Sequence, residues 1–240
     1  MSKSASLPRV YDCWLGGAQH TPVDAAEGTR LSEVLPELPA TVRAQRLFQR
    51  EQVAHLAGEG ISQFFVLGAG FPTGGHVHEQ LPTARVFYSD PNFDVVQPGA
   101  GLLAGIRKRV LYRSIDPLNP DDLDGIAPRD LDILEDLPFQ PLLSSSAPIG
   151  IVMVGFAEHL TDEGLEQALN NLFNWAAPGS GLILTLVGEA PGLSEFFAAA
   201  GQPFHTRSQL TSTGGWTLAG DFQPAGEGAP TFLKGALLRR

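Results

Sequence analysis

The amino-acid sequence predicts an α/β fold built on an open, mostly parallel β-sheet, and three observations support this prediction. Apolar stretches of strand length alternate with segments whose apolar residues recur at helical spacing, as in parallel sheets joined by right-handed crossovers. No repeat of about 20 to 50 residues is present, which argues against a solenoid or a propeller. Near the C-terminus two strand-like segments follow each other without a helix, which favours an antiparallel pair.

The first regular element of the sheet region is a helix expected over 42–56. Val42, Val53 and Leu56 share one of its faces, and Gly58 ends it. The apolar runs that follow are continuous, which predicts strands buried on both faces. The expected strands are 61–67, 85–89, 110–115, 149–154 and 182–187, and the expected helices are about 76–81 and 165–176.

The two ends of the chain differ from this alternation. Residues 1–40 contain a glycine turn and two Leu-Pro steps, and we expect a helical cap across the sheet, followed by a single domain over 41–240. Two C-terminal strands, 211–220 and 231–238, are expected to pair at the sheet edge through a loose loop between them. The stretch 117–147, rich in Pro, Asp and Ser, is expected to be mostly irregular with at most one short helix.

The composition narrows the range of partners. Lys and Arg total 16 against 26 Asp and Glu, and the net charge of -10 repels nucleic-acid phosphates and anionic lipid. The basic run from Arg107 to Arg109 is explained as a solvated strand edge. The single cysteine, Cys13, has no partner for a disulfide or a zinc site, and no apolar run reaches about 18 residues. We therefore expect a cytoplasmic protein with a small-molecule substrate, no nucleic-acid or membrane partner and no bound metal.

Candidate ligand-binding residues stand where predicted parallel strands end, because ligands bind beyond the carboxyl ends of such strands. Glycines in the turn from Gly68 to Gly70 allow close approach of the backbone to a ligand. Asp90 ends the second strand 22 residues after Gly68, a spacing at which an acid accepts the ribose hydroxyls of a nucleoside. Asp116 ends the third strand, where its carboxylate either accepts from an adenine amino group or only begins the turn at Pro117. The predicted cofactor-binding residues are Gly68, Ala69, Gly70, Asp90, Pro91, Ile115 and Asp116.

The glycine spacing favours S-adenosylmethionine over a dinucleotide. A dinucleotide needs a helix N-terminus at its pyrophosphate, usually within G-x-G-x-x-G. The glycines from Gly68 to Gly74 break that spacing, and Phe71 with Pro72 would crowd a diphosphate. S-adenosylmethionine carries no phosphate, so a roomier turn suffices. An NAD-dependent oxidoreductase is therefore the less favoured alternative.

Two longer motifs carry a family resemblance. The segment from Arg9 to Gly17 reads R-V-Y-D-x-x-L-G-G, and the segment from Gly68 to Thr73 reads G-x-G-x-P-T. With both motifs the chain resembles an actinobacterial-type family of S-adenosylmethionine-dependent methyltransferases, and the similarity spans nearly the whole chain. The resemblance implies a class I methyltransferase (Rossmann-like) fold, S-adenosyl-L-methionine as cofactor, and methyl transfer to an acceptor that the sequence does not identify.

The chain departs from the family pattern close to the turn. The family has an aspartate two residues before the first glycine, where it helps to orient the amino-acid end of the cofactor, and this chain has Val66. Gln45 precedes Arg46 where Asn-Arg is typical, and 18–21 read Ala-Gln-His-Thr instead of Lys-Asp-Asn-Phe. A second hypothesis is therefore a catalytically degenerate protein that keeps the fold and binds an adenosyl ligand or acts as a scaffold.

The remaining candidates concern catalysis and the substrate. Glu158 and His159 follow the fourth strand, and an imidazole with a pKa of about 6.5 suits proton removal at neutral pH. Equally, this pair only precedes a helix capped by Thr161. No G-x-S-x-G motif occurs, which disfavours a hydrolase. Candidate walls of a substrate pocket are Tyr11, Trp14 and Phe156, of which the first two equally fit a role in packing the cap.

Overall fold

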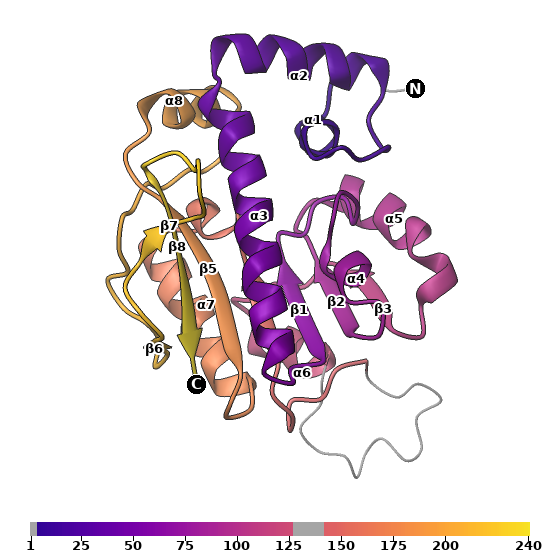
Figure 1. Ribbon diagram of the computed structural model, residues 1–240, viewed down its shortest axis with the longest axis vertical. Helices are drawn as coiled ribbons and strands as arrows, with labels where there is room; N and C mark the ends of the chain where they lie inside the picture. The colour runs from indigo at the N-terminus through magenta and orange to yellow at the C-terminus, as the bar shows by residue number, and fades with distance from the viewer. Residues whose placement is uncertain (1–3, 127–141) are drawn as a thin grey trace.

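A computed structural model describes residues 4–126 and 142–240, and its centre is one mixed β-sheet (Figure 1). The strand order is β3-β2-β1-β4-β5-β8-β6, and β7 also pairs with β8. Strands β1 to β5 are parallel, whereas β8 is antiparallel to β5, β6 and β7. The strands are β1 (Gln63–Leu67), β2 (Arg85–Ser89), β3 (Val110–Arg113), β4 (Gly150–Met153), β5 (Gly181–Val187), β6 (Thr217–Leu218), β7 (Gln223–Pro224) and β8 (Leu233–Arg239).

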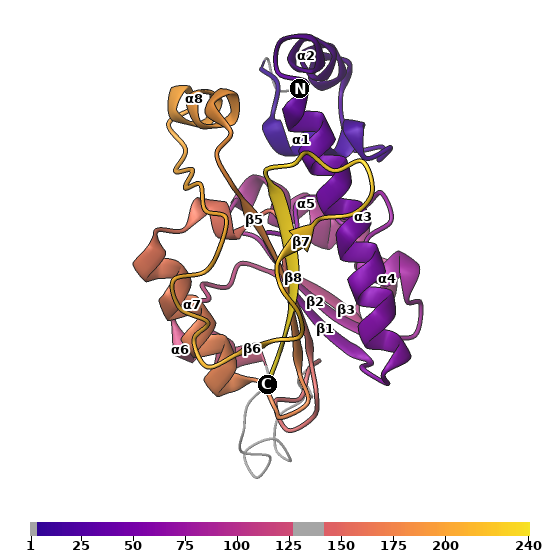
Figure 2. The ribbon, with the colours of Figure 1, turned by 60° about the vertical axis from the view of Figure 1, so that its left-hand side comes forward.

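Helices cover both faces of the sheet and its carboxyl edge. Helices α3, α4 and α5 lie on one face and α6 and α7 on the other, while α1, α2 and α8 lie beyond the carboxyl ends of the parallel strands (Figure 2). Within the described ranges, no helix is long and apolar enough to cross a membrane. The helices are α1 (Leu7–Trp14), α2 (Pro22–Val34), α3 (Glu37–Gly58), α4 (Val77–Gln80), α5 (Phe93–Leu102), α6 (Pro120–Ile126), α7 (Asp162–Trp175) and α8 (Pro191–Ala199), with 3-10 turns η1 (Ala104–Ile106) and η3 (Ala157–His159).

The core lies on both sides of β1, which is buried along its whole length. Phe64 and Val66 belong to the hydrophobic cluster under α3, and Phe65 and Leu67 belong to the cluster under α7. Successive strand residues point to opposite faces, so a strand with helices on both sides must be apolar at every position. This arrangement confirms the predicted mostly parallel sheet and its C-terminal antiparallel strands.

Two helices were not expected from the sequence, and both contain residues that usually break helices. Helix α5 includes Pro98 and Gly99 and is capped by Asn92, whose side chain accepts from the backbone N–H of Asp94. Gly99 is required there, because a Cβ would lie 2.6 Å from a ring carbon of Tyr112. Helix α8 begins with Pro-Gly, a start that Pro tolerates because it lacks the N–H that a first turn leaves unpaired.

The C-terminal prediction was partly wrong in extent. The strand expected over 211–220 is reduced to Thr217–Leu218, because Gly214 and Gly215 have φ values of +58° and +91° and turn the chain before it. Part of the expected loop forms the short strand Gln223–Pro224 instead.

The boundaries of two other predicted segments shift. Helix α3 begins at Glu37, inside the expected cap, and the division into 1–40 and 41–240 stays a prediction. The short helix expected within 117–147 is α6, whereas 127–141 lie outside the described residues.

Candidate cofactor and substrate site

A cavity of about 650 Å³ lies at the carboxyl ends of the parallel strands, under the cap. Its walls come from α1, one face of α3, the ends of β1 to β4, and the segments that follow β4 and α8. The structure brings together there all the residues predicted to bind cofactor, and also Tyr11, Phe156, His159 and Val66. Trp14 and Glu158 are not among the residues that line this cavity.

The glycine turn after β1 is held from several sides. Gly68 and Gly70 have φ values of +62° and +61°, a backbone region that favours glycine. A Cβ on Gly68 would also lie 2.7 Å from the ring of Phe156. The Tyr112 hydroxyl donates to the Gly70 carbonyl oxygen at 2.7 Å, and His76 Nε2 donates to the Ala69 carbonyl oxygen at 2.9 Å. The turn is therefore fixed before any ligand binds.

Asp90 is part of the same network. Its Oδ2 accepts from the backbone N–H of Gly70 at 2.9 Å, and its Oδ1 accepts from that of Asn92 at 2.9 Å. The side chain borders the cavity although the residue is only 9% exposed. Burial raises the pKa of Asp90, and the two backbone donors work against that shift. Each oxygen keeps a second lone pair with which a carboxylate accepts from a ligand hydroxyl.

Asp116 has both features that the sequence left as alternatives. It borders the cavity, and its Oδ1 accepts from the backbone N–H of Leu118 at 2.9 Å, which makes it the first residue of a turn. Neighbouring Ile115 is fixed to β2, because Ser89 Oγ accepts from its N–H at 2.9 Å. The carboxylate thus stands at the end of β3 in a local structure that does not require a ligand.

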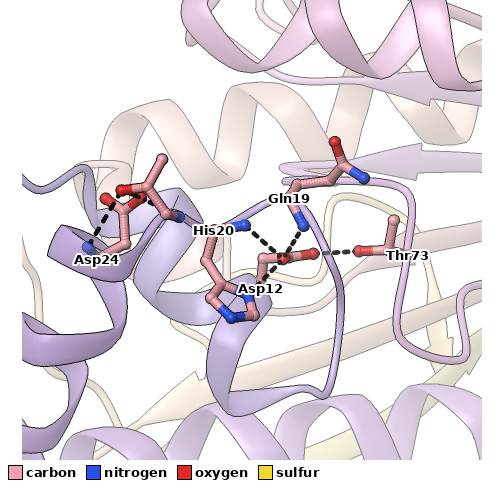
Figure 3. Close-up of polar contacts among 6 residues, drawn as sticks. Asp12, Gln19, His20, Asp24 and Thr73 are labelled. Carbon is pink, nitrogen blue, oxygen red and sulfur yellow. Dashed lines mark hydrogen bonds and ion pairs between the residues drawn. The ribbon is translucent and has the colours of Figure 1, made fainter. Parts of the chain in front are cut away.

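The two sequence motifs are joined through Asp12 of α1 (Figure 3). Asp12 Oδ2 accepts from the backbone N–H groups of Gln19 and His20 at 2.7 Å and 3.2 Å. Its Oδ1 accepts from the Thr73 hydroxyl, at the end of the glycine-rich motif. A Cβ on Gly17 would overlap Oδ1 at 1.9 Å, so this position needs glycine. The cap is therefore anchored directly on the turn that borders the cavity.

Glu158 and His159 lie on η3, and their surroundings differ. Gln45 Nε2 donates to Glu158 Oε1 at 3.0 Å, whereas the buried Oε2 has no hydrogen-bond partner among the described residues. His159 borders the cavity, and its Nδ1 donates to the Pro203 carbonyl oxygen at 2.9 Å. A neutral ring that donates from Nδ1 has its lone pair on Nε2.

The two aromatic residues of α1 have different surroundings. Tyr11 borders the cavity, and burial, followed by the nearby charge of Glu158, raises its pKa. Trp14 stacks on Tyr11 at 5.7 Å between ring centroids and donates from Nε1 to the Gly28 carbonyl oxygen at 3.2 Å. Trp14 therefore joins α1 to α2.

Sequence reasoning missed several residues that border the cavity. Val42, Gln45, Arg46 and Gln49 of α3 do so at positions i, i+3, i+4 and i+7, a spacing that places them on one helix face. That spacing could have been recognised in the sequence. Other missed residues come from α1 or from the α8 region, and no local pattern marks them: Leu7, Pro8, Phe197, Gln202 and Pro203.

No group of three or more His, Cys, Asp or Glu side chains that could hold a metal ion occurs in residues 4–126 or 142–240. His76 and His78 are instead engaged within the protein. The Tyr88 hydroxyl lies 2.9 Å from His78 Nδ1, and His76 contacts the carbonyl of Ala69 as described above.

Comparison with protein families places most of the chain in one group. A family model described as S-adenosyl methyltransferase matches residues 2–211. Among curated proteins, none is significantly similar to this chain.

Solved structures share the fold over nearly the full length. A DUF574 family protein from Streptomyces avermitilis is 26% identical, with a TM-score of 0.77, and the match covers 99% of this chain and 98% of that one. A candidate methyltransferase from Thermobifida fusca is 23% identical with a TM-score of 0.77, covering 99% and 95%. Magnesium protoporphyrin IX methyltransferase from Synechocystis, solved with bound S-adenosylhomocysteine, is 12% identical with a TM-score of 0.55, covering 96% and 93%. The sheet is thus that of a class I methyltransferase.

Proposed function

This chain belongs to the S-adenosyl methyltransferase family, and from this premise we propose that it binds S-adenosylmethionine in the cavity and transfers the methyl group to a small-molecule acceptor. The observation that carries the proposal is the convergence of three strand ends on one cavity. The glycine turn, Asp90 and Asp116 belong to successive strands of the sheet order, so a single nucleoside can reach all three.

Each predicted residue has a role in this proposal. Asp90 accepts from the ribose hydroxyls, Asp116 accepts from the adenine amino group, and Pro91 and Ile115 flank the nucleoside. Gly68 and Gly70, which have no side chains, let the backbone of the turn approach the sulfonium part of the cofactor. Tyr11 and Phe156 would then border the acceptor.

The chemical step is a direct displacement. The acceptor atom forms a bond to the methyl carbon, the bond between sulfur and methyl breaks, and its electron pair stays on sulfur, so the sulfonium becomes the thioether of S-adenosylhomocysteine. A hydroxyl or amine acceptor also loses a proton, and His159 Nε2 is the candidate base because Nδ1 is occupied by Pro203. Glu158 is the second candidate for the base that removes this proton. Positioning and exclusion of water supply most of the acceleration in such a reaction.

A degenerate protein is the second candidate function, and Val66 is the observation that favours it. This residue borders the cavity with an apolar side chain where the family pattern has aspartate. A nicotinamide cofactor has less support. Helix α4 begins only at Val77, so no helix N-terminus follows the glycine turn directly to receive a pyrophosphate.

Calorimetric titration with S-adenosylmethionine, S-adenosylhomocysteine and NAD tests these alternatives. Micromolar binding of the first two and not of NAD is the expected result. Asp90→Ala should abolish that binding, whereas Asp94→Ala, which removes an exposed carboxylate in the next helix, should leave it unchanged. Binding of NAD alone would overturn the proposal. If none of the three ligands binds, the proposal is also wrong, and the protein is then better explained as a scaffold. Unchanged affinity in Asp90→Ala would refute the ribose assignment.

A further inference from the structure

The cavity has two parts of different chemistry. Its charged side chains stand at the strand ends and beside the glycine turn, whereas the rest is mostly apolar. This second part, which we call the acceptor part, comes from α1, from α8 and the segment after it, and from η3 with the residue before it. Its residues include Tyr11, Phe156, His159, Phe197, Gln202 and Pro203. With the nucleoside at the strand ends, the methyl acceptor occupies this part.

The charged side chains that border the cavity are placed away from the acceptor part or are already engaged. Asp12 accepts from two backbone N–H groups and from a hydroxyl. Arg46 donates from Nη1 to two carbonyl oxygens beside the glycine turn, at 2.8 Å and 3.2 Å. Asp90 and Asp116 follow β2 and β3. Apart from Asp12, the described residues of α1, η3 and the α8 region that border the cavity include no Asp, Glu, Lys or Arg.

Three aromatic rings border the acceptor part, and each packs against another group of the protein. Tyr11 stacks on Trp14 at 5.7 Å between ring centroids, and Phe197 stacks on Phe204 at 4.6 Å. Phe156 lies against the glycine turn, because a Cβ on the first glycine of the turn would lie 2.7 Å from its ring. Aromatic rings attract other rings in offset-stacked or edge-to-face arrangements. These three side chains therefore suit a ligand with a flat, unsaturated body.

The polar groups of the acceptor part suit uncharged partners. His159 donates from Nδ1 to the Pro203 carbonyl oxygen, which leaves the Nε2 lone pair of the neutral ring for a ligand hydroxyl. The Gln202 amide can donate and accept. A ligand charge buried beside these groups would have no counter-charge among the described residues of the acceptor part, which is costly. A hydroxyl, a carbonyl or a neutral amine can be paired there.

We propose that the methyl acceptor is an uncharged aromatic molecule, bound between the rings of Tyr11, Phe156 and Phe197 with its nucleophilic hydroxyl or amine toward His159. This inference rests on the proposed function, because it assumes that the adenosyl cofactor occupies the strand ends. It narrows the small-molecule acceptor to one chemical class. Acceptors that place a carboxylate, a phosphate or an ammonium group in the acceptor part are excluded.

The test compares three fluorescent probes that share one ring system and differ in charge. 1-Aminoanthracene is uncharged at neutral pH, anthracene-1-carboxylate is an anion, and 1-(aminomethyl)anthracene is a cation. Fluorescence anisotropy measures their binding in saturating S-adenosylhomocysteine, which fills the cofactor part of the cavity. The wild-type protein should bind 1-aminoanthracene at least about tenfold more tightly than either charged probe, because only a charged probe must bury an unpaired charge.

Two variants locate the bound probe. Phe197→Leu should weaken 1-aminoanthracene by about twofold to tenfold and leave S-adenosylhomocysteine within about twofold. Gln202→Lys changes an exposed side chain and adds a cation to the acceptor part, so it should strengthen anthracene-1-carboxylate by about twofold to fivefold without strengthening the neutral probe. Phe93→Leu is the matched control, because its ring is 64% exposed and does not border the cavity. It should change none of these affinities.

Several results would overturn the inference while cofactor binding stands. One is a charged probe that binds the wild-type protein as tightly as 1-aminoanthracene does, and another is failure of 1-aminoanthracene to bind the protein loaded with S-adenosylhomocysteine. Equal effects of Phe197→Leu and Phe93→Leu would place the probe outside the acceptor part and would also contradict the inference. Failure of the wild-type protein to bind S-adenosylhomocysteine would instead refute the proposed function itself.

Discussion

Two walls of the cavity are built in different ways. The turn wall, formed by the glycine turn with the ends of β1 and β2 and the docked α1, is held by buried polar side chains: Asp12, His76, Asp90 and Tyr112 each bond to the backbone or to a hydroxyl. In the aromatic wall His159 and Phe197 border the cavity, and Phe204 packs against both rings from behind, so the side chains of this wall contact one another through their rings. Polar ties between η3 and the chain after α8 lie beside these rings: His159 Nδ1 donates to the Pro203 carbonyl oxygen, and the backbone N–H of His205 donates to the Glu158 carbonyl oxygen at 2.7 Å.

The difference suits the two ligands of the proposed reaction. A network in which each polar atom has a partner has one low-energy geometry, and this suits a cofactor that is always the same. Ring contacts are less directional, so their geometry can change at lower cost when an acceptor of another shape binds. We therefore expect substitutions in the turn wall to reduce both stability and cofactor affinity, and substitutions in the aromatic wall to reduce neither by much.

The largest effect is expected for Asp12→Ala. The change leaves the N–H groups of Gln19 and His20 and the hydroxyl of Thr73 without their acceptor, and removal of a buried charged acceptor should cost about 3 kcal/mol. Urea denaturation measures this loss, and the affinity for S-adenosylhomocysteine should fall with it.

Asp12→Asn is the informative comparison for that variant. The amide oxygen can still accept from the two backbone groups, and its nitrogen can donate to Thr73, so only the charge is lost. We expect a cost of about 1 kcal/mol. Glu33→Ala, an exposed change on α2, should leave the unfolding curve unchanged. If Asp12→Ala unfolds at the wild-type urea concentration, Asp12 does not anchor the cap.

The next effect is a pH dependence that comes from His76. Burial, assisted by the charge of Arg46, lowers the pKa of His76 well below 6.5, so the folded protein keeps this ring neutral at a pH at which the unfolded chain protonates it. The unfolded state then binds more protons, and the free energy of unfolding falls as the pH drops below about 6.5. At pH 5.5 the loss from this single ring is at most about 1.4 kcal/mol, the value for a ring that stays neutral in the folded state.

His76→Gln isolates that contribution. Both proteins are denatured with urea between about pH 7.5 and pH 5.5, and the variant should lose less stability than the wild type across that range. His78, whose pKa is also lowered by burial, is present in both proteins, so its contribution cancels. Parallel curves for the two proteins would mean that His76 is protonated in the folded state.

A smaller effect is expected for Tyr112→Phe, which removes the hydrogen bond to the Gly70 carbonyl. The loss should be about 1 kcal/mol in stability, with S-adenosylhomocysteine bound about threefold more weakly because the turn is less constrained. Tyr88→Phe is a matched control: it removes a hydroxyl that bonds to His78 instead of to the turn, and it keeps the ring that packs against Tyr112. It should cost similar stability without a change in affinity. An equal loss of affinity in both variants would show that the hydrogen bond from Tyr112 to the turn has no specific effect on cofactor binding.

The sequence predicted the turn wall better than the aromatic wall, for a physical reason. The glycine turn and Asp90 follow from local patterns, because an apolar run fixes where a strand ends and a parallel sheet brings such ends together. The bond from Asp12 to Thr73 joins residues 61 apart, and that from His159 to Pro203 joins residues 44 apart. Such pairings depend on tertiary packing. Helix α8, which brings Phe197 to the cavity, was hidden by its Pro-Gly start.

The smallest effect is expected for Phe204→Leu in the aromatic wall. The Phe204 ring stacks on Phe197 at 4.6 Å between centroids and 7° between planes, and such a pair contributes about 0.5 to 1.5 kcal/mol beyond its buried area. Leucine keeps most of the apolar contact, so the unfolding midpoint should fall slightly and S-adenosylhomocysteine affinity should stay within about twofold of the wild type. Because Tyr112→Phe is expected to cost little more stability yet to weaken binding, the two variants separate stability from affinity. A loss of affinity in Phe204→Leu as large as in Tyr112→Phe would place the cofactor against the aromatic wall and remove the proposed division between the two walls.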